Sequence, residues 1–268
     1  RRTEALPRAS TCIALPMRIP ILLVGLLTAT IGRAEARSIH VVVALCDNVN
    51  QGIVPVPKSL GNGQDKDHNL YWGAAYGVRT WFDRSKTWVR QKVTVTLPEH
   101  VLERCIWKHT GSGAVLVADA YDGAYIQLAT ETFFTYTSGN NATSVVVGGA
   151  TVQVGGGADL IAYVGHDGLM DFAAPTVKAP ANKEVRRTII LACISQHYFR
   201  EPLRTTGASP LVWTTGLMAP EAYTLEAAIS AWVGGADDAA VREKAAAAYH
   251  AYQKCGLNAA RKLLVTGW

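Results

Sequence analysis

The sequence lacks the short motifs that mark the commonest metal, redox and nucleotide sites. It has no C-x-x-C pair, which argues against a zinc or dithiol redox site, and no G-K-[ST] or strand–GxGxxG–helix pattern, which argues against a phosphate loop. The glycines at 148–149 and 155–157 fit tight turns instead. Long repeats, charge blocks and low-complexity tracts are also missing. We therefore expect one continuous folded domain that needs no cofactor.

No apolar run reaches the roughly 20 residues that a membrane-spanning helix needs. The apolar run over 19–28 has an arginine near its start and is followed by small residues at Ala34 and Ala36. This pattern is typical of a secretory signal peptide with an A-x-A cleavage site; an uncleaved anchor or a buried helix is the alternative. We expect a signal peptide over residues 17–36 and an upstream extension of the reading frame over 1–16. The protein would be exported, to the periplasm or outside the cell, without a membrane span after cleavage.

The sequence has little excess of positive charge once this leader is removed. Residues 1–36 hold five Arg and two Glu, so the formal charge falls from +5 for the whole chain to +2 for residues 37–268. No basic stripe remains, which argues against a nucleic-acid partner. Residues 37–268 are long enough for a full core in a single α/β domain, with a helical C-terminal part over about 237–268.

Cysteine is sparse as well. Cys12 precedes the expected signal peptide, and residues 37–268 contain Cys46, Cys105, Cys193 and Cys255. An even number in an exported protein permits two disulfides. If Cys193 is a free thiol, at most one internal bridge can form.

Apolar runs alternate with helix-like stretches along the chain, which favours a mostly parallel sheet covered by helices on both faces. Four of the runs are continuous, as in strands buried on both sides. The expected strands cover 40–45, 114–118, 160–164, 188–192 and 210–214, the expected helices 70–82, 124–135, 224–232 and 237–254 with a further turn over 258–264, and a small β-hairpin 144–154.

Few polar residues follow these strands, at the edge where open α/β sheets bind ligands. They are Asp47, Asp119, His166, Asp167 and Cys193. His166 and Cys193 follow consecutive main strands, and an imidazole can activate a thiol and later protonate a leaving group. Each residue alone is more often structural, but the joint pattern is more specific. A metal held by His166 and the carboxylates is a weaker alternative, because no recognised ligand spacing joins them.

The segments IAYVGHDG and TIILAC resemble the caspase-like cysteine peptidases, which include metacaspases, gingipains, legumains and separases. In that superfamily a histidine follows one apolar strand, typically as His-Gly, and a cysteine follows the next, often after a small residue. The resemblance implies a caspase-like α/β/α fold, a peptide or protein substrate, His166 as catalytic histidine and Cys193 as nucleophile. It also implies an oxyanion-binding N–H near the His-Gly turn, from Gly165 or Gly168. The inserted Asp167 departs from the family pattern.

Two further residues are candidates for the site. The resemblance places the segment beginning at Trp213 where relatives line the primary specificity pocket. A helix is expected directly after Cys193, and its positive end would favour the thiolate. His197 would lie one turn along that helix and is a second, weaker candidate for the base.

The leading interpretation is an exported cysteine peptidase with a Cys193–His166 dyad. One alternative is a non-catalytic exported α/β binding module that uses the same strand-end cleft. Another is a cysteine amidase or acyltransferase that acts on cell-envelope material. The fold alone does not choose among them, and the sequence leaves the substrate and the oligomeric state open.

Export can be tested directly. Expressed from Met17 in a bacterial host, the protein should accumulate outside the cytoplasm with its N-terminus at or near Arg37, because the A-x-A site ends at Ala36. N-terminal sequencing of the fractionated protein measures this. Soluble cytoplasmic protein that retains residues 17–36 would contradict the prediction.

Overall fold

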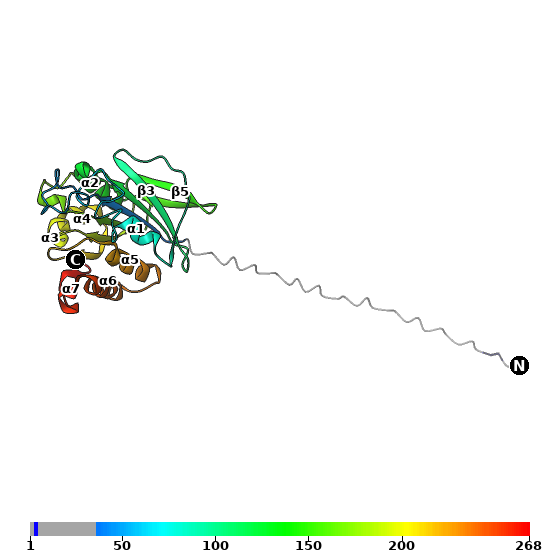
Figure 1. The fold of residues 1–268 in the computed structure, drawn as a ribbon. Coiled ribbons are helices and arrows are strands. Elements are labelled where there is room, and N and C mark those ends of the chain that lie inside the picture. Colours follow the sequence, from blue (N-terminus) through cyan, green and yellow to red (C-terminus); the bar gives the residue numbers. More distant parts are fainter. Residues whose placement is uncertain (1–2, 5–35) are drawn as a thin grey trace. The chain divides into compact units, whose positions relative to one another are not determined.

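A mixed β-sheet forms the centre of the computed structural model, which describes residues 3–4 and 36–268 (Figure 1). The predicted signal peptide, except Ala36, and Cys12 lie outside the described residues. The chain divides into two units, residues 1–34 and residues 35–268, and the elements described below belong to the second unit.

The strands of the main sheet are β1 (Ser38–Ala44), β2 (Trp88–Arg90), β3 (Val101–His109), β4 (Val115–Tyr121), β7 (Leu160–Val164), β8 (Arg187–Leu191), β9 (Ser209–Thr214) and β10 (Leu264–Val265). The helices are α1 (Val78–Asp83), α2 (Ile126–Thr137), α3 (Ser195–Tyr198), α4 (Arg200–Thr206), α5 (Ala222–Val233), α6 (Asp238–Gln253) and α7 (Leu257–Leu263), with short 3₁₀ helices η1 (Gly123–Tyr125) and η2 (Gly168–Met170). In this part of the chain no helix combines the length and the apolar character that a bilayer span requires.

The strand order is β10-β9-β8-β7-β1-β4-β3-β2. The five central strands from β9 to β4 run parallel, whereas β10, β3 and β2 pair antiparallel with their neighbours. The predicted α/β class with a mostly parallel sheet is therefore confirmed. The five strands expected from the sequence are the five parallel ones.

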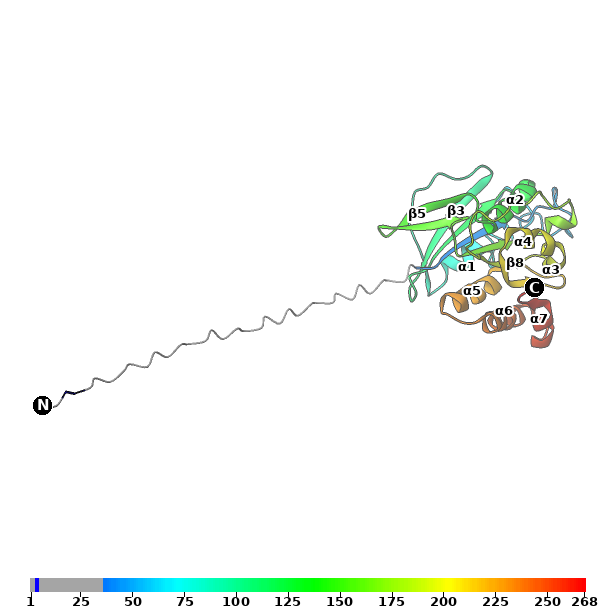
Figure 2. The same cartoon turned by 180° about the vertical axis from the view of Figure 1, so that it is seen from behind.

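Alternate side chains of the central strands enter two different cores. In β1, Val41 and Val43 pack with α1, α5 and α6, whereas Val42 and Ala44 pack with α2 and α4. Figures 1 and 2 show these two groups of helices on opposite sides of the sheet. All seven residues of β1 are buried, which explains why the sequence shows a continuous apolar run rather than alternation.

The predicted hairpin is confirmed as β5 (Ala142–Val147) and β6 (Ala150–Gly155), a separate two-stranded sheet. The turn residues Gly148 and Gly149 have φ values of 58° and 80°. Two positive φ angles in succession suit a two-residue hairpin turn and explain the glycine pair. The buried valines of the hairpin pack on Ile106, Val115 and Val117 of β3 and β4 and form with them a third, smaller apolar cluster.

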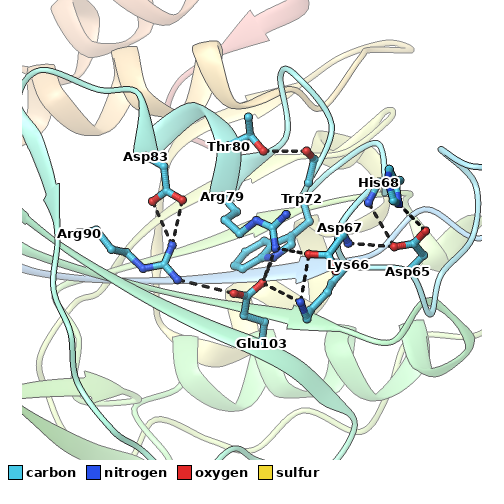
Figure 3. A network of polar contacts seen from close by, with 11 residues as sticks. Asp65, Lys66, Asp67, His68, Trp72, Arg79, Thr80, Asp83, Arg90 and Glu103 are labelled. Atoms are coloured by element: carbon cyan, nitrogen blue, oxygen red, sulfur yellow. Dashed lines mark hydrogen bonds and ion pairs between the residues drawn. The ribbon is translucent and has the colours of Figure 1, made fainter.

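The helix predicted over 70–82 is largely wrong, because only α1 at its C-terminal end is helical. Upstream, the side chain of Asn69 accepts hydrogen bonds from the N–H groups of Cys46 and Tyr71 and donates to the Cys46 carbonyl. Such bonds compete with helical backbone bonds. Figure 3 shows the neighbouring ion network, in which Trp72 and Arg79 both donate to Glu103 of β3, at 2.8 and 3.0 Å. This segment is therefore held by side chains rather than by helix.

Asp119 does not end a strand, contrary to expectation, because β4 continues to Tyr121. Its carboxylate accepts two hydrogen bonds of 2.6 Å from Arg104 and lies 3.0 Å from Nε2 of His40. Burial opposes ionisation, yet the bonds from Arg104 and His40 hold the pKa of Asp119 below its ordinary value. Nδ1 of His40 accepts the N–H of Gly155 at 2.9 Å, so this cluster joins the sheet to the hairpin.

Removing Asp119 should strongly destabilise the fold. The Asp119→Ala variant leaves the Arg104 charge without its buried partner, which typically costs about 3–5 kcal/mol of unfolding free energy. Urea denaturation measures the loss. The control is Glu201→Ala, which breaks an exposed pair with Arg204 and should change little. A similar, small effect of both variants would show that the cluster is not a stabilising unit.

Candidate active site

His166 and Cys193 follow neighbouring parallel strands, as the sequence predicts. Val164, the last residue of β7, pairs with Leu191, the last residue of β8, and each candidate lies two residues further along. The N–H of Gly165 donates to the Leu191 carbonyl at 3.2 Å, so the pairing extends past the strand ends. Both residues lie just beyond the last paired residues of their strands. His166 and Cys193 therefore leave the sheet at the same edge and at equivalent positions.

A strained turn follows Cys193. Ile194 has φ 50° and ψ 29°, in the left-handed region that β-branched residues rarely adopt, and α3 begins at the next residue. The N–H of Ile194 donates to the carbonyl of Gly216 at 2.9 Å. Strain of this kind persists only where the surroundings enforce it, and it concentrates at functional sites.

Two buried hydroxyls enforce this turn. Ser195 Oγ donates to the carbonyl of Ile190 at 3.0 Å and accepts the N–H of Thr214 at 3.0 Å. Thr214 Oγ1 accepts the N–H of Ser195 at 3.1 Å and donates to the carbonyl of Ala192. The turn is thus fixed to β9. Neither Ser195 nor Thr214 was predicted from the sequence. The only hint was that a serine, Ser195, follows two residues after Cys193.

Cys193 is a half-buried free thiol, and the other three cysteines within residues 36–268 are free as well. Its Sγ lies 3.4 Å from the N–H of Met218 and 3.6 Å from the Met218 carbonyl. Burial raises the pKa of Cys193; the Met218 N–H lowers it and the charge of Asp167 raises it further, so the result lies above the ordinary value. Between Sγ and the His166 ring the described residues contain no hydrogen bond. The resting cysteine is therefore mainly a thiol.

The His166 ring is buried and held at one nitrogen. Nε2 lies 2.8 Å from Oδ2 of Asp171, and the backbone carbonyl of His166 accepts the Tyr163 hydroxyl at 2.9 Å. Nδ1 makes no hydrogen bond within residues 36–268. When the Asp171 carboxylate accepts the proton on Nε2, Nδ1 carries the free lone pair. Asp171 was not predicted from the sequence, because no known spacing relates it to His166.

Asp167 is fully buried beside this pair. Oδ1 accepts the N–H of Leu169 at 3.0 Å and caps η2, whereas Oδ2 has no partner among the described residues. Burial raises the pKa of Asp167 to about 7. The hydrogen bond from the Leu169 N–H lowers this pKa, and the nearby charge of Asp171 raises it. The charge of this carboxyl group also raises the pKa of Cys193.

The two glycine candidates for oxyanion binding differ. Gly165 has φ 153°, and a Cβ there would come within 2.8 Å of the Ala44 carbonyl, so glycine is required for close strand packing. Its N–H is already used by Leu191. Gly168 N–H makes no hydrogen bond in the described part of the chain. Gly168 is therefore the better candidate donor.

The other predicted site residues have structural surroundings. Asp47 accepts hydrogen bonds from Asn50 and Gln64 and so closes its own loop. His197 is exposed and packs edge-on against Tyr198, with ring centroids 4.9 Å apart. Trp213 is fully buried in β9. The positions of these three residues give no support to a role in the site.

Two large cavities of the described residues lie away from this edge of the sheet. Within the described residues no group of three or more His, Cys, Asp or Glu side chains is arranged to hold a metal ion. Cavities of about 800 and 810 Å³ lie beside α1 and beside the hairpin, and neither is lined by His166 or Cys193.

The comparisons with known proteins returned no match to a family model, to a curated protein or to a solved structure.

The buried carboxyl of Asp167 should make stability depend on pH. Its pKa is about 7 in the folded protein and 3.8 ordinarily, so folding favours the protonated form and stability is lost as pH rises from about 4 to above 7. Asp167→Asn keeps the acceptor for Leu169 and removes this loss, by up to about 4 kcal/mol at pH 8 relative to pH 4. Urea denaturation of both proteins across this range measures it. Parallel pH profiles for the two proteins would refute the assignment.

Proposed function

We propose that this protein is an exported cysteine peptidase of the caspase-like type. The observation that carries the proposal is the register of β7 with β8, which sets His166 and Cys193 at equivalent positions beyond two parallel strand ends. The strained turn at Ile194 and the unbonded Nδ1 of His166 support it. Export rests on the signal-peptide pattern in the sequence.

The reaction begins with proton transfer from Cys193 Sγ to Nδ1 of His166. The thiolate then attacks the carbonyl carbon of a peptide bond, and the oxygen takes the negative charge, toward which the Gly168 N–H can donate. The imidazolium gives its proton to the leaving amine as the C–N bond breaks, which leaves a thioester on Cys193. Water, deprotonated by His166, hydrolyses the thioester and restores the thiol.

The raised pKa of Cys193 bears on the step at which His166 would act as base. Since the resting group is a thiol, His166 must take the proton when substrate binds rather than maintain a permanent thiolate–imidazolium pair. Catalytic hydrogen bonds often form only in the substrate complex. The Met218 backbone contact with Sγ would be exchanged for the His166 contact at that stage.

A second candidate is supported by the same Met218 contact. An exported binding module of this fold needs no activated thiol, and a Cys193 Sγ held by backbone rather than by His166 fits that role. A cysteine amidase or acyltransferase would use the same two residues as the peptidase and differ only in the acyl group that it accepts.

The dyad can be tested by mutation. Cys193→Ala and His166→Ala should each reduce hydrolysis of a fluorogenic peptide library by at least about 100-fold, and the double variant should be little worse, because residues that act as one unit are not additive. Labelling of Cys193 by a thiol-reactive peptidyl probe, which occupies the substrate site, should slow in His166→Ala, because His166 takes the thiol proton when a substrate-like group is bound. The matched control is His197→Ala, an exposed histidine on α3 that should change neither rate.

Two results would contradict the proposal. Loss of probe labelling in His197→Ala but not in His166→Ala would show that the base is His197 rather than His166. If the rate at which the probe labels Cys193 is unchanged in both variants, and the unmodified protein cleaves no peptide or amide, the binding module is favoured.

A further inference from the structure

A chain of hydrogen bonds fixes the far side of the His166 ring. Asp171 follows η2, and its N–H donates to the carbonyl of Gly168 at 2.9 Å. This short turn brings the carboxylate back to His166, with Oδ2 2.8 Å from Nε2. The same Oδ2 accepts the N–H of Gly52 at 2.8 Å. The ring is thus connected to the loop after β1 as well as to its own strand.

Gly52 is shaped for this contact. A Cβ at Gly52 would lie 2.2 Å from Oδ1 of Asp171, so only glycine lets the backbone approach the carboxylate. The preceding residue, Gln51, donates to the carbonyls of Leu45 and Gly123 at 2.8 and 2.9 Å and so holds the loop in place. The N–H that binds Asp171 therefore comes from an anchored loop.

Other histidine–carboxylate pairs in residues 36–268 lack this combination. The ring of His40 bonds at both nitrogens, to Asp119 and to the Gly155 N–H, and is fully enclosed in the sheet. The ring of His68 contacts Asp65 at 2.8 Å but is 70% exposed on a loop. His100 contacts Glu99 at 3.2 Å, but its side chain is 28% exposed against 7% for His166. Within residues 36–268, His166 is therefore the pair that combines a buried ring, one nitrogen on a carboxylate and a second nitrogen without a protein hydrogen bond.

We propose that Asp171 is the positioning residue of the site: it holds Nε2–H of His166, keeps Nδ1 as the proton acceptor for Cys193 and stabilises the imidazolium that forms. This role rests on the proposed peptidase function. A carboxylate that accepts the proton of one ring nitrogen fixes the tautomer and the orientation of the ring, and its charge favours the protonated ring during the reaction. Asp171 acts through His166 and contacts no substrate.

The test compares Asp171→Asn with Asp65→Asn in the full chain. Asp65 is a close match, because it also contacts a histidine at 2.8 Å and its side chain is 32% exposed against 30% for Asp171. We expect Asp171→Asn to lower kcat by about 100-fold with little change in KM, and Asp65→Asn to leave both unchanged. Gly52→Ala, which displaces the carboxylate without changing a charge, should lower kcat in the same direction.

A second readout does not need activity. The ¹⁵N chemical shifts of His166 report which ring nitrogen carries the proton. In the unmodified protein we expect the Nε2–H tautomer, and in Asp171→Asn a mixture of tautomers. Urea denaturation confirms that each variant is folded before its spectrum is interpreted.

The outcomes separate this proposal from the peptidase proposal. If Cys193→Ala abolishes hydrolysis while Asp171→Asn keeps full kcat or the unmodified tautomer, the positioning role is wrong and the peptidase stands. If the unmodified protein cleaves nothing and a thiol-reactive peptidyl probe labels Cys193 no faster than Cys255, an exposed free thiol, the peptidase is wrong. The ¹⁵N shifts of His166 then still decide whether Asp171 fixes its tautomer.

Discussion

The pairing of β7 with β8 is the constraint on which the candidate site depends. Because Val164 pairs with Leu191 in parallel, the two strands end level and the residues beyond them emerge together. A register shift of one residue would move one candidate to the opposite face, away from the other. The apolar side chains that fill both cores specify this register, so the same residues that stabilise the sheet also align His166 with Cys193.

Much of the fold could be predicted because buried elements have a simple pattern of apolar residues in the sequence. Strands enclosed on both faces, such as β7 over Leu160–Val164, are continuous apolar runs and were located correctly. The pair Gly148–Gly149 marked the hairpin turn in the sequence, because glycine readily adopts the positive φ angles that both residues have in the structure. The start of α6 followed from Asp237, whose side chain accepts the N–H of Ala240 at 2.8 Å. In each case a local rule agrees with the tertiary structure.

The rest could not be predicted, because it depends on partners distant in sequence. β3 carries charged residues such as Arg104, which looks unlike a buried strand until its partner Asp119 in β4 is known. The aromatic spacing before α1 resembled a helix, yet the side chain of Asn69 imposes turns there. Asp171 gave no signal, since only the folded path of η2 brings its carboxylate to His166. The strands that position the site could thus be predicted from the sequence, whereas the side chains that support His166 could not.

The two carboxyl groups beside His166 have opposite effects on the proposed chemistry. Asp171 accepts hydrogen bonds from His166 and Gly52, so its negative charge is stabilised where it favours an imidazolium. Asp167 is buried with one oxygen unpartnered, and its ionisation opposes the thiolate of Cys193. Near its pKa of about 7, Asp167 changes from neutral to charged, so the thiol becomes harder to ionise as pH rises through that value. In the proposed reaction, two carboxyl groups four residues apart therefore act in opposite directions: Asp171 lies where it favours the imidazolium, and the charge of Asp167 opposes the thiolate.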